Sequence, residues 1–257
     1  MGSSSPRSYG GVSGAERQQQ RRARLLEAAL DIMGRDEWRD VTVERLCADA
    51  GLNKRYFYES FGEVDAVAEA VIDDVAAAVR DATVAAVAEV AAKPLEQQAF
   101  AGVQVLVHSL VDDPRRAKVL LGGVAATPGL RAHRVAVMRS LTGVLIEHAR
   151  AVHGVELKHD PLALIAPAFV VGGTADAILA FVDGTAAITV DELIAQLTTL
   201  WLITGDGAAA VARTRLNGES GQLPPTSAGS GGGKGVEGVG DDAGGGDAPD
   251  EPMDSVP

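Results

Sequence analysis

The chain lacks most of the residue chemistry on which disulfides, metal sites and nucleophilic enzymes depend. Its 257 residues include one cysteine and five histidines. A single cysteine excludes an intramolecular disulfide and agrees with a reducing cytoplasm. His148 and His153 are five residues apart, so their side chains diverge on a helix and form no metal-ligand pair. We therefore predict no catalytic residue, no metal and no cofactor.

Aromatic residues and uninterrupted apolar runs are also scarce. Aromatic residues make up 4% of the chain, which disfavours a binding site built mainly on stacking with large flat molecules. The most apolar stretch, residues 162–182, is interrupted by Pro167 and Asp176, so we expect a buried or dimer-forming helix and no membrane span. No apolar core typical of a secretory signal follows the first charges.

Both ends of the chain have compositions typical of disorder. Residues 1–14 are rich in Ser and Gly and form a predicted disordered leader, and residues 217–257 form a predicted disordered tail of Gly, Pro, Ser and Asp. The tail includes GSGGGKG, but Gly235 follows Lys234 where a phosphate-binding loop has Ser or Thr. Eight acidic residues against one lysine give the tail much of the formal net charge of −12.

Between these ends the chain predicts an all-α fold. No segment alternates with period two strongly enough to require a strand. Prolines and glycine pairs separate segments of helical length, and we expect helices over residues 65–92, 95–111, 114–125, 130–152, 162–182 and 190–204. We predict a three-helix domain at residues 15–62, followed by a larger helical domain at residues 63–216.

Residues 41–61, VTVERLCADAGLNKRYFYESF, have helix-turn-helix spacing. Thr42 stands where an N-cap hydroxyl belongs, and apolar residues follow at i, i+3, i+4 and i+7 of one buried helix face over residues 42–50. Gly51 supplies the positive φ of a sharp turn, and Asn53 can cap a second helix from residue 54 to residue 61. This arrangement is typical of proteins that bind duplex DNA.

The second helix leaves basic and aromatic side chains on its free side. At about 100° per residue, Phe57 and Phe61 fall on the buried face. Arginine can bond guanine bidentately in a major groove, while tyrosine and lysine can reach phosphates. The alternative is that these side chains are simply solvated or cover a core edge. Asn53 and four residues of the helix are the predicted DNA contacts here: Lys54, Arg55, Tyr56 and Tyr58.

Residues 24–61 resemble the DNA-binding domain of the TetR (tetracycline-repressor-like) family of transcriptional regulators. The resemblance is carried by an apolar run over residues 25–33 and then by Trp38, Thr42, Val43, Ala50, Gly51, Tyr58 and Phe61. It implies that Thr42 and Tyr58 touch phosphates and that Arg55 and Tyr56 face bases. Val64 departs from the family pattern, which often has lysine there, so one phosphate contact is expected to be missing.

An arginine-rich arm precedes this motif. The arm carries Arg7, Arg17, Arg21, Arg22 and Arg24, of which we predict that Arg22 and Arg24 contact DNA. Ser13 and Glu16 form a possible capping box, so the arm is either a helical extension or a disordered leader. Because salt screens charges beyond about 8 Å, an acidic chain can still present a local basic face. The acidic tail either competes with DNA for this arm or only aids solubility.

The larger domain predicts a dimer interface and an effector pocket. The resemblance implies a homodimer, in which two helices from each subunit form a four-helix bundle; the alternative is that both helices belong to the internal core. Predicted interface residues are Gly172, Gly173, Asp176, Leu193, Leu197, Leu200 and Trp201. Candidate pocket residues are Phe100, Gln104, His108, Met138, Leu141, Leu145, Phe169 and Thr174.

The chemistry of that pocket stays open at this point. Gln104 and His108 are i, i+4 on one helix face and could orient a polar group of a ligand. A satisfied core histidine and a surface glutamine explain the same residues. The few aromatic residues favour an aliphatic or acyl-like effector.

Together these features predict a cytoplasmic, ligand-responsive transcriptional regulator that binds a palindromic double-stranded DNA operator. The resemblance favours a repressor that a small molecule releases from DNA. An activator or an effector-independent regulator is the alternative within DNA binding. From another class, the alternative is a helical small-molecule or lipid carrier that does not bind DNA.

Overall fold

A computed structural model describes residues 13–122, 127–154 and 160–220 as helices and their connections, with no strand in these ranges. The predicted all-α fold is confirmed. The elements are α1 (Gly14–Gly34), the short 3-10 turn η1 (Trp38–Asp40), α2 (Val43–Asp49), α3 (Lys54–Tyr58), α4 (Val64–Glu89), α5 (Leu95–Val111), α6 (Pro114–Leu121), α7 (Pro128–His153), α8 (Pro161–Val182) and α9 (Val190–Ser220).

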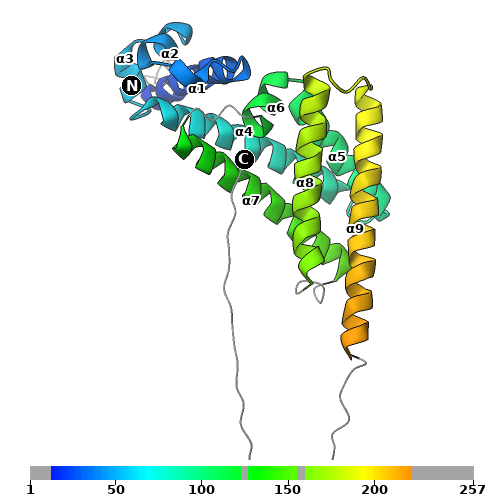
Figure 1. Ribbon diagram of the computed structural model, residues 1–257. Helices are drawn as coiled ribbons and strands as arrows, with labels where there is room; N and C mark the ends of the chain where they lie inside the picture. The colour runs from blue at the N-terminus through cyan, green and yellow to red at the C-terminus, as the bar shows by residue number, and fades with distance from the viewer. Residues whose placement is uncertain (1–12, 123–126, 155–159, 221–257) are drawn as a thin grey trace, which may run out of the picture.

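The elements α1 to α3, which we call the N-terminal unit, lie together at one end of the molecule (Figure 1). The capping box that starts α1 is formed: the Glu16 amide donates to Oγ of Ser13 at 3.1 Å, and the Ser13 amide donates to the Glu16 carboxylate at 2.6 Å. Leu25, Ile32 and Phe57 are fully buried between the helices. Residues 13 and 14, expected in a disordered leader, therefore begin a capped helix, and residues 1–12 lie outside the described residues.

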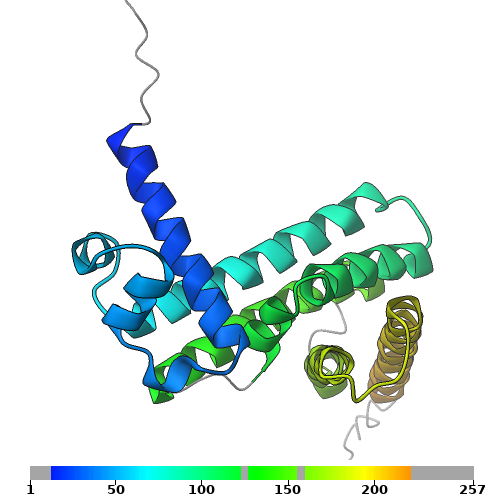
Figure 2. The same ribbon diagram turned by 90° about the horizontal axis from the view of Figure 1, so that it is seen from above.

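Helices α4 to α9, which we call the body, form the rest of the described chain. The amino-terminal half of α4 packs on α1, and its later turns run on into the body beside α5 and α7. Viewed from above, α8 and α9 cross these helices at the end opposite the N-terminal unit (Figure 2). One continuous apolar core runs from Leu25 in α1 to Leu197 in α9.

Helices α4, α5, α7 and α8 lie within three residues of their predicted ends, but two shorter helices stop early. Helix α3 ends at Tyr58, because the amides of Ser60 and Phe61 both turn back to the carbonyl of Phe57. Helix α6 ends at Leu121, since Gly122 has extended backbone with ψ of 178°. Residues 123–125, the rest of that predicted helix, lie outside the described residues.

Helix α9 is longer than predicted and continues 16 residues past the expected end at residue 204. Gly205 and Gly207 do not stop it, because the Ala-rich turns that follow favour helix. Ala209 and Ala212 are also buried, packed against Ala163 of α8. Residues 217–220, expected in the disordered tail, are therefore helical, and residues 221–257 lie outside the described residues.

Helix α8 is the one described helix that is long and apolar enough to cross a membrane by length and composition, a test that core helices also pass. It packs against α9, α7, α6 and α5. Ile178 is buried in this packing, whereas Ile165 and Phe169 lie on the exposed side. One face of α8 is therefore buried in the core of its own chain, as one alternative predicted, and the predicted dimer contact on its exposed face stays a prediction.

Candidate nucleic-acid interface and ligand cavity

The turn between α2 and α3 has the geometry that its residues predict. Oγ1 of Thr42 accepts from the Arg45 amide at 3.2 Å and caps α2. Gly51 has φ of 64°, a left-handed conformation that glycine adopts at low cost. Oδ1 of Asn53 accepts from the Tyr56 amide at 3.2 Å and caps α3. Both caps and the glycine turn are thus formed.

Helix α3 buries one side chain and exposes the predicted contact residues. Phe57 is fully buried, and the ring of Tyr58 packs edge-on against it with 5.2 Å between centroids. Tyr58 is nevertheless 61% exposed, and the Arg55 side chain is 84% exposed. Lys54 is exposed and Tyr56 is half-buried. The exposed side of α3 therefore carries a guanidinium, an ammonium and a phenol.

Carboxylates hold several of these cations in the free protein. Glu59 accepts from Nε of Arg55 at 3.2 Å and from Nη2 of Arg21 at 3.3 Å. Lys54 forms an ion pair with Glu44, which raises the pKa of Lys54 and lowers that of Glu44. These pairs keep long side chains in place at a surface where water also competes for them.

The arginine-rich arm is helical from residue 14 and stacks on α3 and the segment that follows it. The guanidinium of Arg21 lies 4.4 Å from the centroid of the Tyr56 ring, and that of Arg22 lies 4.9 Å from the centroid of Phe61. Arg24 is exposed on the same helix. The helical alternative for the arm is therefore correct from residue 14 onward, and Arg22 is a packed residue as well as a cation.

Sequence reasoning missed the acceptors that position this surface. Glu59 joins α1 to α3, because its backbone carbonyl also accepts from Nε2 of the Gln18 side chain at 3.3 Å. Its i+4 distance from Arg55 is the one signal that could have predicted the pair. Nothing in the sequence spacing brings Arg21 or Gln18 to Glu59, since they lie 38 and 41 residues away.

The body contains an apolar cavity of about 410 Å³, lined by residues of α4 to α9. Its walls are mainly aliphatic, with few polar groups. Of the predicted pocket residues, four line it: Met138, Leu141, Leu145 and Thr174. Oγ1 of Thr174 accepts from Nε1 of Trp201 at 2.8 Å, so this polar pair is already satisfied within the wall.

The other predicted pocket residues lie outside this cavity. On α5 the cavity side carries Gly102, Leu106 and Leu110, so the Gln104 and His108 pair lines a shallow surface beside Arg116 instead. Nδ1 of His108 is 3.1 Å from the Asp112 carboxylate. Phe100 is 44% exposed. Phe169 is 71% exposed, because α8 turns Pro167, Val170 and Thr174 toward the cavity.

The cavity wall also has polar groups that were not predicted, among them those of Thr83 and His148. The hydroxyl of Thr83 on α4 is buried and has no hydrogen-bond partner among the described residues. Partial burial in the wall lowers the pKa of His148, and the nearby His153 lowers it further. These residues were missed because polar residues on apolar helices carry no sequence signal for which side faces a cavity.

The predicted dimer residues separate into two sets. Leu193 and Leu197 are buried in the core of their own chain, and Trp201 is half-buried in the cavity wall, so these three face inward. The others are exposed: Gly172, Gly173, Asp176 and Leu200. The exposed set shares its side of α8 and α9 with the exposed apolar residues Ile165, Phe169 and Ile203.

Comparison with solved structures identifies the fold. The fatty acid degradation regulator FadR from Bacillus halodurans aligns with a TM-score of 0.61 and 16% identity, over 71% of this chain and 94% of that one. A TetR-family regulator from Streptomyces coelicolor aligns with a TM-score of 0.55 and 17% identity, over 77% and 89% of the two chains. The chain has the TetR-regulator fold.

A further TetR-family regulator, from Marinobacter aquaeolei VT8, aligns with a TM-score of 0.52 and 16% identity, over 74% of this chain and 97% of that one. No protein-family model and no curated protein matches the sequence. The TetR fold is thus shared at low sequence identity. What this chain binds has to be argued from its own residues.

Proposed function

We propose that this chain is a cytoplasmic DNA-binding transcriptional regulator with the TetR fold and not an enzyme. The observation that supports this most is the exposed side of α3, where Arg55 and Tyr58 project from a capped helix-turn-helix at one end of the molecule. Lys54, Tyr56 and Thr42 flank them, with Arg22 and Arg24 on α1 and Asn53 at the helix start. Phosphate contacts would position α3, and Arg55 would read a base edge.

The regulator acts as a homodimer on a palindromic operator. The exposed apolar side of α8 and α9, with Gly172, Gly173, Asp176 and Leu200, is the proposed interface. Helices α8 and α9 lie at the end of the body opposite the N-terminal unit in both views, so two N-terminal units would remain accessible in this dimer (Figures 1 and 2). Half-sites one turn apart place two recognition helices about 34 to 36 Å apart.

The cavity binds an apolar, aliphatic or acyl-like effector that releases the operator, so the regulator is a repressor. Its largely aliphatic lining supports that chemistry, and the FadR structure with this fold is described as a regulator of fatty acid degradation. A full switch from 1:99 to 99:1 needs about 5.5 kcal/mol of differential effector binding between the two conformations. Long-chain fatty acids and acyl thioesters are the first ligands to test.

Selection of bound duplexes from a random pool tests DNA binding directly. A palindromic consensus is expected. On that operator, Arg55→Ala should weaken binding about ten-fold or more, since a bidentate base contact contributes about 1–3 kcal/mol. Tyr58→Phe should weaken binding less and equally across sequences, because it removes only a phosphate contact.

The helical carrier is the rival, and it predicts different behaviour. A carrier would bind the aliphatic ligand but select no duplex, and its weak DNA binding would be insensitive to Arg55→Ala. Operator affinity of a regulator should instead fall steeply with salt. A reporter gene placed behind the selected operator then separates repression from activation by the sign of its change when the chain is expressed.

A further inference from the structure

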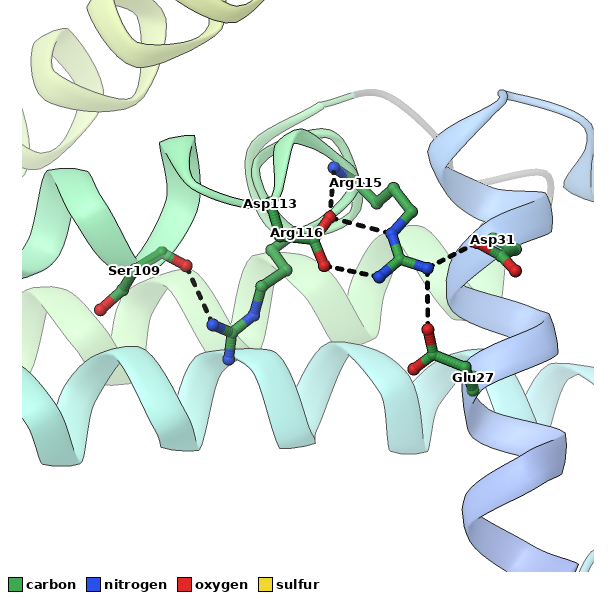
Figure 3. Close-up of polar contacts among 6 residues, drawn as sticks. All are labelled: Glu27, Asp31, Ser109, Asp113, Arg115 and Arg116. Carbon is green, nitrogen blue, oxygen red and sulfur yellow. Dashed lines mark hydrogen bonds and ion pairs between the residues drawn. The ribbon is translucent and has the colours of Figure 1, made fainter. Parts of the chain in front are cut away.

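An arginine of the body is bound by acidic residues of the N-terminal unit. Nη1 of Arg115, in the first turn of α6, donates to Glu27 Oε1 at 2.8 Å and to Asp31 Oδ1 at 2.5 Å, both on α1 (Figure 3). On its other side, Nε and Nη2 donate to the two carboxylate oxygens of Asp113 at 2.9 and 2.7 Å. One guanidinium thus joins two carboxylates of α1 to the carboxylate that caps α6.

The backbones of α1 and α6 approach closely at this point. A Cβ on Gly34 would lie 2.8 Å from Cβ of Arg115, so a larger residue at the end of α1 would not fit without movement. The Arg115 side chain is 34% exposed, and its acceptors Glu27 and Asp31 are 62% and 45% exposed, so water screens part of these ion pairs. Arg115 also lowers the pKa of Asp113, the residue that caps α6.

The far end of the same helix lines the cavity. Leu120 and Leu121 are in the cavity wall, five and six residues after Arg115. At 1.5 Å per residue, about 8 Å of helix separates the ion pairs from the cavity. Because α6 has only eight residues and is hydrogen-bonded throughout, displacement of its last turn displaces Arg115 as well.

The second connection between the two parts is α4, whose first half packs against α1 and whose later turns line the cavity. The apolar core that α4 shares with α1 is one attachment of the N-terminal unit to the body, and the contact of α1 with α6 is another. The two attachments together set the direction in which the recognition helix points.

We propose that Arg115 is a positioning residue that locks the N-terminal unit to the body through Glu27 and Asp31 and passes changes at the cavity to α1. The lock is a property of the protein without DNA or ligand. Its use in operator release rests on the proposed function. Without the guanidinium, the three carboxylates would face one another and repel.

The two tryptophans allow the lock to be measured without DNA or ligand. Trp38 is buried in the N-terminal unit, and Trp201 lies in the body beside the cavity. Incorporation of 5-fluorotryptophan gives one ¹⁹F resonance for each part of the full chain, and Trp201→Phe assigns them. In the parent protein both native resonances should disappear at the same temperature.

Two sets of substitutions cut the lock from opposite sides. Arg115→Gln removes the guanidinium from α6, whereas the pair Glu27→Gln and Asp31→Asn removes its acceptors from α1 and leaves the α6 cap intact. Arg116→Gln is the matched control, because Arg116 neighbours Arg115 but donates to the Ser109 carbonyl within the body at 3.1 Å (Figure 3).

In both variants that break the lock, the native Trp38 resonance should disappear about 4 °C or more below that of Trp201. In Arg116→Gln the two native resonances should disappear at the same temperature. Coincident midpoints in both cut variants would overturn the lock. A split in Arg115→Gln alone would also overturn it, since that result shows a role confined to α6.

Operator binding then tests the use of the lock. The ratio of operator affinities without and with a releasing fatty acid should fall at least ten-fold in both cut variants and stay at the parent value in Arg116→Gln. If the two unfolding temperatures separate but this affinity ratio is unchanged, Arg115 does not transmit changes at the cavity to α1. If the parent protein binds no duplex, the proposed function fails, and the melts still decide whether the lock exists.

Discussion

Glu59 shows how one side chain controls a charged surface. It accepts from Arg21 and Arg55, while Glu44 pairs with Lys54, so three cations beside the proposed groove-facing surface have carboxylate partners. These carboxylates hold the cations in place and also repel phosphate. They should therefore reduce sequence-independent binding more than binding to the operator, where base contacts compensate.

Glu59→Gln tests this balance. Non-specific duplex affinity at low salt should rise several-fold, and the slope of log affinity against log salt should steepen by about one, since the surface loses one negative charge that offsets its cations. Fluorescence anisotropy with a random duplex measures both quantities. Glu96→Gln, an equal change of charge on α5, is the control, and equal effects of the two variants would contradict the role of Glu59.

His148 makes folding sensitive to pH. Its pKa is depressed in the folded protein by burial and by His153, so the unfolded chain binds this proton more tightly. Stability should therefore be full at pH 8 and fall as the pH drops through the ordinary histidine pKa of about 6.5. Thermal melts should show a smaller loss between pH 8 and 5.5 in His148→Gln than in the parent; an identical loss would contradict this assignment.

At the level of the helices, two glycines have opposite roles. Gly34 ends α1 where α6 crosses closely, and a Cβ there would clash with Arg115. Gly207 lies inside α9, and a Cβ there would meet nothing within 4 Å. The first glycine is required by packing between helices, whereas the second only weakens a helix.

Gly207→Ala should accordingly raise the free energy of unfolding by about 0.5–1 kcal/mol. Gly34→Ala should lower it by about 1–3 kcal/mol, the usual cost of overpacking. Urea denaturation of both variants measures these changes. Stabilisation by Gly34→Ala would show that the α1 and α6 contact is loose and would weaken the case for a lock there.

At the scale of the whole molecule, α8 and α9 carry several exposed apolar side chains. Phe169 is 71% exposed, Ile203 65% and Leu200 56%, all on α8 and α9. Exposed apolar side chains that gather on two neighbouring helices are typical of an interaction site. The proposed homodimer would cover it and leave both N-terminal units accessible.

Leu200→Glu should produce a monomer with native helix content, because the charge falls on the interface and not in the core. Sedimentation velocity and circular dichroism measure mass and folding together, and operator affinity should drop with the mass. Leu193→Glu, buried in the same helix, should instead unfold the chain. A Leu200→Glu dimer would place the interface elsewhere.

The local sequence was sufficient to predict the helix-turn-helix. Thr42, Gly51 and Asn53 act on backbone groups within a few residues of themselves, so caps and a positive-φ turn can be read without the rest of the chain. The all-α architecture and most helix ends can likewise be predicted from the spacing of apolar residues and from the prolines and glycines that separate the helices. Helix α9 was predicted too short, because burial of Ala209 and Ala212 against α8 depends on packing and outweighs its two glycines.

Tertiary packing decided which face of each body helix meets the core, the cavity or the exterior. Leu193, Leu197 and Leu200 follow one apolar stripe in the sequence, but only the first two are buried within the chain. Glu27 and Asp31 gave no indication of a partner that lies more than 80 residues away on α6. The sequence by itself determined the motif proposed to bind DNA, because caps and turns are local, and the three-dimensional fold decided the cavity, the exposed apolar surface and the Arg115 contacts, because these depend on how distant helices cross.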